Sequence, residues 1–140
     1  MRGLISRFLA ATWLACSATA GGASDIRISD HPLYSIILEG TIVPGDYDKL
    51  QKLINENCPS TSWSTSCPSD VYLASPGGSV AEAMKIGKLV RMLRLGTQVP
   101  EDAPADLRQK IIRALKLQDP KANYLCASAC FFIAVAGIDR

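Results

Sequence analysis

The sequence predicts an α/β protein built on a parallel sheet with flanking helices. Short runs rich in β-branched and aromatic residues alternate with longer segments of helical periodicity. This alternation is typical of parallel strands joined by crossover helices. Hydrophobic residues make up 48% of the chain and charged residues 20%, so the chain is too apolar to be disordered. Its 140 residues are enough for one domain.

The N-terminal residues 1–23 have the features of a secretory signal peptide. Two arginines form a positive n-region, residues 8–16 form an apolar core, and Ala18-Thr19-Ala20 is a small-residue cleavage site. The apolar run is shorter than the ~20 residues of a membrane span. We therefore predict a periplasmic or secreted protein. An uncleaved anchor and a lipoprotein modified at Cys16 are the alternatives.

The charge balance excludes strongly basic function classes. The chain has 15 basic and 13 acidic residues, and loss of the two N-terminal arginines leaves 13 of each sign. A formally neutral chain lacks the electrostatic footprint of a nucleic-acid-binding protein and a polybasic membrane signal. We therefore expect no nucleic-acid partner.

The first strand is predicted at residues 34–40, and residues 41–45 continue it into a turn. Asp46 is expected to cap the next helix, which fades near Asn57. The apolar face of this helix is predicted to contain Tyr47, Leu50, Leu53 and Ile54. Residues 58–70 are rich in serine, threonine and proline, which predicts a loop.

The second strand is predicted at residues 71–74, followed by a tight turn and a helix over about residues 79–95. The apolar face of this helix is expected to contain Val80, Ala83, Met84, Gly87, Val90 and Leu93. The cationic residues on its other faces indicate a solvated surface; they are Lys85, Lys88, Arg91 and Arg94.

The C-terminal part begins with a short strand predicted at residues 97–99. Residues 100–123 are interpreted as a helical insertion, with Pro104 as the first residue of its helix. The apolar stripe of that helix comprises Leu107, Ile111 and Leu115. Residues 131–137 are small and apolar, so we expect them to be buried.

Four cysteines remain after removal of the signal segment. An even number in an oxidising compartment predicts two disulfides. Three pairings can form, and Cys58–Cys67 with Cys126–Cys130 is favoured because each pair is close in sequence. A zinc site is the rival interpretation, but the chain has one histidine, His31, and no CxxC motif. We expect no metal and no organic cofactor.

Two motifs could support chemistry. In residues 75–79 (SPGGS), two glycines between a strand and a helix allow backbone N–H groups to approach an oxyanion. A plain tight turn is the alternative, and a phosphate loop is disfavoured because the Walker lysine is missing. The second motif is Ser128, whose small neighbours permit close approach of a substrate carbonyl. Its alternative is a small buried serine in a packed helix.

Together these motifs resemble the Clp protease proteolytic subunit family of the Clp/crotonase superfamily. The resemblance runs from Ile36 to the C-terminus and rests on residues 39–42 (EGTI), residues 74–80 (ASPGGSV) and the Ser128 segment. The export signal and cysteines make the chain most similar to periplasmic Clp-protease-like proteins. The resemblance implies that Ser128 is the nucleophile, that the Gly78 and Ala129 amides form the oxyanion hole, and that the substrate is a peptide or protein.

The chain departs from this family after the serine. The family places its catalytic histidine and acidic partner further along, whereas this sequence ends at Arg140, twelve residues after Ser128. We therefore expect residues 24–140 to form a C-terminally truncated, incomplete domain with little or no proteolysis. Lys85 and Lys121 are alternative bases, as in the serine–lysine dyads of signal peptide peptidases. The ring assembly of the family implies that a homo-oligomer can form, and no ATPase partner is expected outside the cytoplasm.

Two other functions stay open. The first is a non-catalytic peptide- or acyl-binding module that uses the same cleft and the same amides. The second is a thiol redox protein that uses Cys126 and Cys130, which the absence of a CxxC motif disfavours.

Overall fold

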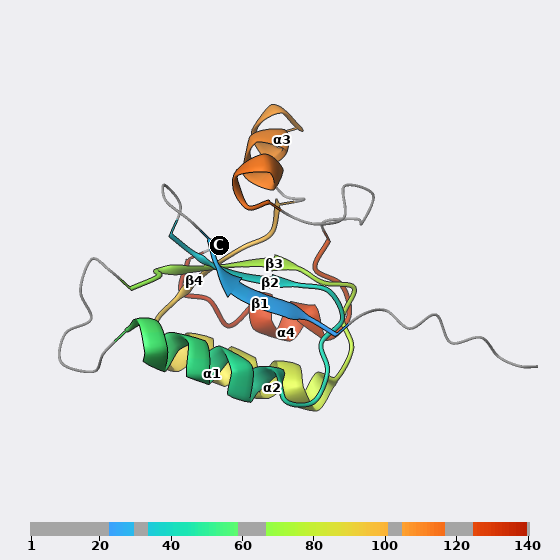
Figure 1. Cartoon of the computed structure of the whole chain (residues 1–140). Helices are drawn as coiled ribbons and strands as arrows, with labels where there is room; N and C mark the ends of the chain where they lie inside the picture. Colours follow the sequence, from blue (N-terminus) through green and yellow to red (C-terminus); the bar gives the residue numbers. More distant parts are fainter. Residues whose placement is uncertain (1–22, 30–33, 59–66, 101–104, 117–124, 140) are drawn as a thin grey trace, which may run out of the picture.

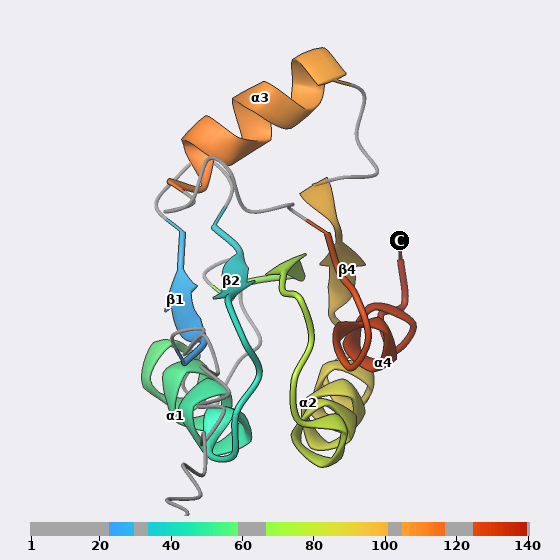
Figure 2. The ribbon, with the colours of Figure 1, turned by 90° about the vertical axis from the view of Figure 1, so that its right-hand side faces the viewer.

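The computed structural model describes residues 23–29, 34–58, 67–100, 105–116 and 125–139. These residues form a four-stranded sheet with helices on both faces (Figures 1 and 2). The predicted α/β class is confirmed at this level. The particular Clp/crotonase fold stays a prediction.

The sheet has the strand order β1-β2-β3-β4. Its strands are β1 (Asp25–Ile28), β2 (Ile36–Glu39), β3 (Asp70–Ala74) and β4 (Gly96–Gln98). The last three strands are parallel, as predicted, whereas β1 pairs antiparallel with β2. β1 was not predicted from the sequence, and it makes the sheet mixed.

The helices divide unequally between the two faces of the sheet. α1 (Asp46–Asn57), α2 (Val80–Met92) and α4 (Cys130–Ala134) lie on one face, and α3 (Ala105–Ala114) lies on the other (Figures 1 and 2). α1 connects β2 to β3, and α2 connects β3 to β4, as the crossover helices of a parallel sheet do. α3 falls within the predicted insertion at residues 100–123.

The larger core lies between the sheet and the face that carries α1, α2 and α4. Successive side chains of a strand point to opposite faces, so alternate residues of β2 and β3 enter this core. Its fully buried members include Ile36, Leu38, Leu50, Val71, Leu73, Ala83, Ile86, Val90 and Ile133. The opposite face has a smaller cluster, in which Ile37 of the sheet packs against Ile112 and Leu115.

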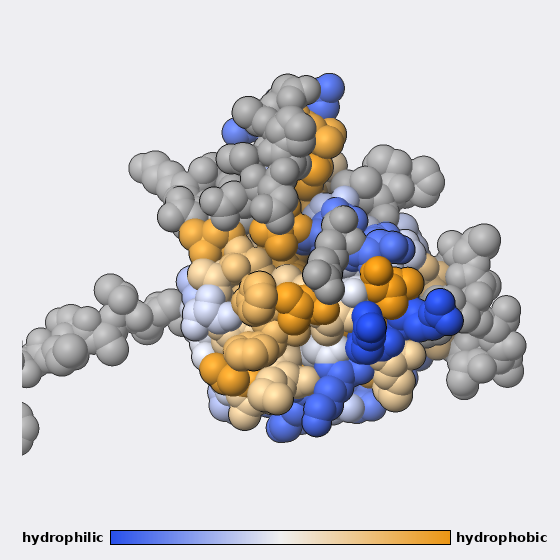
Figure 3. Space-filling view, turned by 180° about the vertical axis from the view of Figure 1, so that it is seen from behind, coloured by the Kyte–Doolittle hydropathy of each residue, from blue (hydrophilic) through white to orange (hydrophobic). Residues whose placement is uncertain are grey.

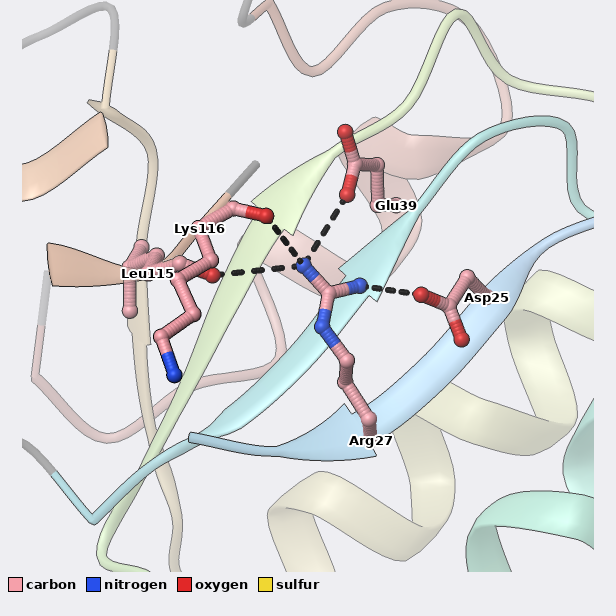
Figure 4. A network of polar contacts seen from close by, with 5 residues as sticks. All are labelled: Asp25, Arg27, Glu39, Leu115 and Lys116. Carbon is pink, nitrogen blue, oxygen red and sulfur yellow. Dashed lines mark hydrogen bonds and ion pairs between the residues drawn. The ribbon is translucent and has the colours of Figure 1, made fainter. Parts of the chain in front are cut away.

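α3 is also held by polar contacts from Arg27 (Figure 4). The Arg27 guanidinium pairs with Asp25 on its own strand and with Glu39 of β2, the latter at 3.1 Å. It also donates hydrogen bonds to the carbonyl oxygens of Leu115 and Lys116, at 3.3 and 3.4 Å. These carbonyls follow the last turn of α3, where backbone oxygens lack helical partners. Arg27 therefore links β1 to the end of α3.

The apolar face predicted for α2 is wrong at two positions. Val80 and Met84 are 46% and 49% exposed, whereas Glu82, Ile86 and Leu89 are buried. Relative to the predicted orientation, the helix is rotated about its own axis, because it packs against α1 on one side and against α4 at Gly87 on the other. A carboxylate can be buried at Glu82 because it accepts hydrogen bonds from the start of α1.

The expected burial of residues 131–137 is also wrong in part. Phe131 is 58% exposed and Phe132 is 43% exposed, whereas Ile133 is fully buried. A helix of five residues on the outside of α2 and β4 can bury only one of its faces. The two phenylalanines lie on the face that stays exposed.

Asp46 is not the N-cap of α1. Gly45 occupies that position with a φ of +98°. The Asp46 side chain is fully buried and accepts a hydrogen bond from the Val43 N–H at 2.7 Å. It also pairs with Lys49 at 2.9 Å. The acidic side chain therefore stabilises the turn before the helix.

Both predicted disulfides are confirmed. The Cα atoms of Cys58 and Cys67 are 5.4 Å apart, and those of Cys126 and Cys130 are 5.2 Å apart. Disulfides persist in oxidising compartments, which fits the predicted export.

Several predictions fall on residues that the structure does not describe. The signal segment lies outside the described residues except for Ala23, which forms a bridge with Thr41. Cys16, His31 and Lys121 also lie outside them. Across the described part of the chain, no helix is both long enough and apolar enough to cross a membrane.

Candidate functional site

The two predicted motifs meet at the carboxyl end of β3. The Ser75 N–H donates a hydrogen bond to the Leu125 carbonyl at 3.0 Å, and the Ala127 N–H donates to the Ser75 carbonyl at 3.0 Å. The SPGGS turn therefore lies directly beside the segment that contains Ser128. The carboxyl ends of parallel strands are the usual place for ligand sites in α/β proteins.

Gly77 allows the two segments to approach closely. It has a φ of +104°, and its N–H donates to the Ser75 side-chain oxygen at 3.1 Å, which tightens the turn. A Cβ atom at this position would lie 2.8 Å from the Ala127 carbonyl oxygen and 2.8 Å from the Ser128 Cβ. A side chain at position 77 would therefore displace Ser128.

Gly78 packs on the backbone that follows β2. The Ile42 N–H donates to the Gly77 carbonyl at 2.8 Å, and the Ser79 N–H donates to the Ile42 carbonyl at 2.9 Å. In this parallel bridge the N–H of Gly78 itself points away from Ile42. Among the described residues it has no hydrogen-bond acceptor. The amide that the family resemblance assigns to the oxyanion hole is therefore not used by the sheet.

Ser128 stands in the turn that leads into α4. It is exposed and has a φ of +53°, in the left-handed region. This conformation costs a residue other than glycine roughly 1–2 kcal/mol, and such strain is concentrated at functional sites. Ser128 is therefore not the small buried serine of the alternative interpretation.

The residue after Ser128 also offers a backbone donor. Ala129 is fully buried, and its N–H makes no hydrogen bond to any residue that the structure describes. Hydrogen bonding in the turn begins one residue later, where the Cys130 N–H donates to the Ala127 carbonyl at 3.1 Å. Two N–H groups without acceptors thus lie on the two segments that meet at Gly77.

The proposed lysine base at position 85 is directed elsewhere. Lys85 pairs with Glu82 at 3.2 Å, and Glu82 accepts hydrogen bonds from the N–H groups of Gly45 and Tyr47 at 3.0 and 2.9 Å. This side of α2 faces α1, whereas α4 packs on the opposite side at Gly87. The structure therefore does not bring Lys85 to the serine.

The hydrogen bond from the Tyr47 N–H lowers the pKa of Glu82 below its ordinary value of 4.5. Burial of the carboxylate opposes this shift, and the Lys85 ammonium supports it. Glu82 is therefore an ionised structural group that anchors the start of α1.

An exposed apolar surface adjoins the site and was not predicted. Phe131 and Phe132 are in edge-to-face contact on α4, with ring centroids 6.4 Å apart. The view onto α4 shows apolar side chains gathered over this part of the molecule (Figure 3). The sequence signal for this surface is the Phe-Phe pair three residues after Ser128, because a short helix cannot bury two adjacent large side chains.

Comparison with family models, with curated proteins and with solved structures gives no match to this chain. Within the described residues, no group of three histidine, cysteine or acidic side chains is placed to hold a metal ion. The chemistry of the site is therefore that of Ser128 and the Gly78 and Ala129 amides.

Proposed function

We propose that this site is the nucleophile and oxyanion part of a periplasmic serine peptidase of the Clp-protease-like type. In this proposal the Ser128 Oγ attacks a peptide carbonyl, and the N–H groups of Gly78 and Ala129 stabilise the oxyanion. The observation that supports it best is the exposed, left-handed Ser128 held against Gly77, with a free N–H on each segment.

The reaction needs a base that the described residues do not supply. Attack forms a bond from Oγ to the carbonyl carbon, and collapse breaks the carbon–nitrogen bond while a base passes the serine proton to the leaving amine. Water then hydrolyses the acyl-enzyme. Among the described residues, the Ser128 side chain makes no hydrogen bond. Roles are therefore assigned to Ser128, Gly78 and Ala129, and the base is not assigned to any described residue.

The exposed phenylalanines support a second candidate function. A non-catalytic module could hold an apolar peptide or acyl chain on Phe131 and Phe132, next to the free amides. Such a module needs no chemistry at Ser128, so the two candidates differ in their dependence on the serine oxygen.

A peptide boronic acid tests the proposal without requiring a base. The serine oxygen bonds to boron in place of one boron hydroxyl, which leaves as water. Addition of hydroxide then gives a tetrahedral boronate that mimics the oxyanion intermediate. We expect ¹¹B NMR to show tetrahedral boron with the unchanged chain and none with Ser128→Ala. Ser69→Ala removes another exposed serine and should leave the adduct intact. Equal affinity for the unchanged chain and Ser128→Ala would instead establish the binding module.

A further inference from the structure

We infer that the Cys126–Cys130 disulfide positions Ser128, so that reduction of this disulfide switches the site off. The inference rests on the proposed function, because it concerns the same serine. It assigns the two cysteines a positioning role rather than a catalytic one.

The disulfide closes a small ring that contains the serine. Only three residues separate the two cysteines, and Ser128 is the middle one. The same five residues contain the left-handed turn and the Ala129 N–H. Few backbone conformations are compatible with so short a ring, so its closure restricts the φ angle of Ser128 directly.

Both ends of the ring are fixed to the protein. Cys126 forms a parallel bridge with Ser75, and Cys130 is fully buried at the start of α4. Ser128 is exposed between these anchors. The ring therefore transmits the positions of β3 and α4 to Ser128, whose φ of +53° lies in the left-handed region.

Opening the ring removes this restraint. A residue other than glycine populates positive φ rarely when nothing enforces it. The remaining restraints on Ser128 are the contact with Gly77 and one hydrogen bond from the Phe131 N–H to the Ser128 carbonyl, at 3.1 Å. We expect the serine to leave the left-handed region when the disulfide is reduced.

A dithiol is one reductant that opens the ring. Its thiolate attacks the Cys126 sulfur, which belongs to the partly exposed partner, and Cys130 leaves as a thiolate that is then protonated. The second thiol of the reductant resolves the mixed disulfide. Two electrons pass to the protein, which gains two thiols, and the reductant becomes a disulfide.

The second disulfide provides a matched control. Cys58 and Cys67 bridge the end of α1 to the segment before β3, at the opposite end of the strand from the SPGGS turn. A Cys58→Ala/Cys67→Ala chain therefore retains only the disulfide around Ser128. A Cys126→Ala/Cys130→Ala chain retains only the distant one.

The experiment is a boronic acid titration of these chains before and after phosphine reduction, with the phosphine removed first. The phosphine takes oxygen from water while the disulfide becomes two thiols. In Cys58→Ala/Cys67→Ala we expect reduction to weaken binding by about tenfold or more, since a small displacement of a reacting group has effects of this size. Reoxidation should restore the affinity. Cys126→Ala/Cys130→Ala should bind weakly both before and after reduction. If reduction leaves the affinity of Cys58→Ala/Cys67→Ala unchanged, the inference is overturned.

A second measurement separates failure of the inference from failure of the proposed function. Backbone chemical shifts and three-bond couplings of Ser128 report the sign of φ by NMR and need no ligand. If the oxidised chain binds no boronic acid, the proposed function fails and the NMR data decide the positioning role. A positive φ that persists after reduction overturns that role, and a change to negative φ supports it.

Discussion

The two faces of the sheet are stabilised in different ways. The face covered by α1, α2 and α4 has a continuous apolar core, in which Leu38 and Leu73 are fully buried. The face covered by α3 has one small cluster, which includes Leu115, and a set of polar contacts from Arg27. Burial of apolar area is the main favourable term in folding, so the first face supplies most of the stability.

This difference explains where the candidate site is located. Gly78 packs on Ile42, a fully buried member of the larger core, and α4 packs against α2. A left-handed serine persists only where the surrounding structure enforces it. The site therefore belongs to the face that has the larger apolar core.

The largest expected effect comes from truncating one leucine on each face. Leu73→Ala should lower the free energy of unfolding by about 2–5 kcal/mol, because the rigid surroundings leave a cavity. Leu115→Ala should lower it by roughly 2 kcal/mol, because the small cluster can collapse around the gap. Chemical denaturation of both variants measures the difference. Equal losses would mean that the two faces contribute alike.

Gly78→Ala should cost roughly 2–4 kcal/mol and abolish the boronate adduct. The added Cβ would lie 2.2 Å from the Ile42 carbonyl oxygen, and φ is +137°. Gly45→Ala is the matched control, because its φ is +98° but nothing lies within 4 Å of the added Cβ. The control should cost about 1 kcal/mol and leave the adduct unchanged. Thermal unfolding and ¹¹B NMR check both results. If Gly78→Ala still binds the boronic acid, the geometry of the site does not depend on the packing of Gly78 against the core.

Glu82→Gln tests a charged group within the apolar face. Loss of the charge weakens the hydrogen bonds from Gly45 and Tyr47, with an expected cost of about 1–3 kcal/mol. Because the folded-state pKa of Glu82 lies below 4.5, its contribution is complete above that pH and is lost as the pH falls through the folded-state value. The difference in unfolding free energy between the unchanged chain and the variant should therefore shrink from pH 6 towards acid. A constant difference would contradict this account.

The sequence predicts the elements that depend on local pattern. The approximate bounds of α1 and α2, the three parallel strands and both disulfides follow from periodicity and cysteine spacing. The two motifs of the site were also identified, although their contact at Gly77 was not. These features could be predicted because each is encoded within a short stretch of chain.

The features that could not be predicted depend on contacts between distant residues. β1 has four residues and is stabilised by pairing with β2. Burial of Glu82 depends on the start of α1, and exposure of Phe131 depends on where α4 packs. The close approach of Ser128 to Gly77 joins two residues that are distant in sequence. No periodicity encodes such relations.

The smallest expected effect concerns Arg27, which links β1 to α3. Arg27→Met retains the apolar stem but removes the hydrogen bonds to the Leu115 and Lys116 carbonyls. Partly exposed ion pairs contribute little, so the global free energy of unfolding should fall by about 1 kcal/mol or less. Amide hydrogen exchange should nevertheless accelerate in α3 and stay unchanged in α1 and α2, because local opening of a weakly packed helix is independent of global unfolding.

Lys52→Met is the control for this variant, because Lys52 forms an exposed pair with Glu56 at 3.8 Å within α1. Lys52→Met should leave amide hydrogen exchange unchanged in the helices of both faces. If exchange in α3 does not change in Arg27→Met, the apolar contacts of Ile112 and Leu115 suffice to hold the helix. The two faces would then differ in the size of their cores but not in the kind of interaction that stabilises them.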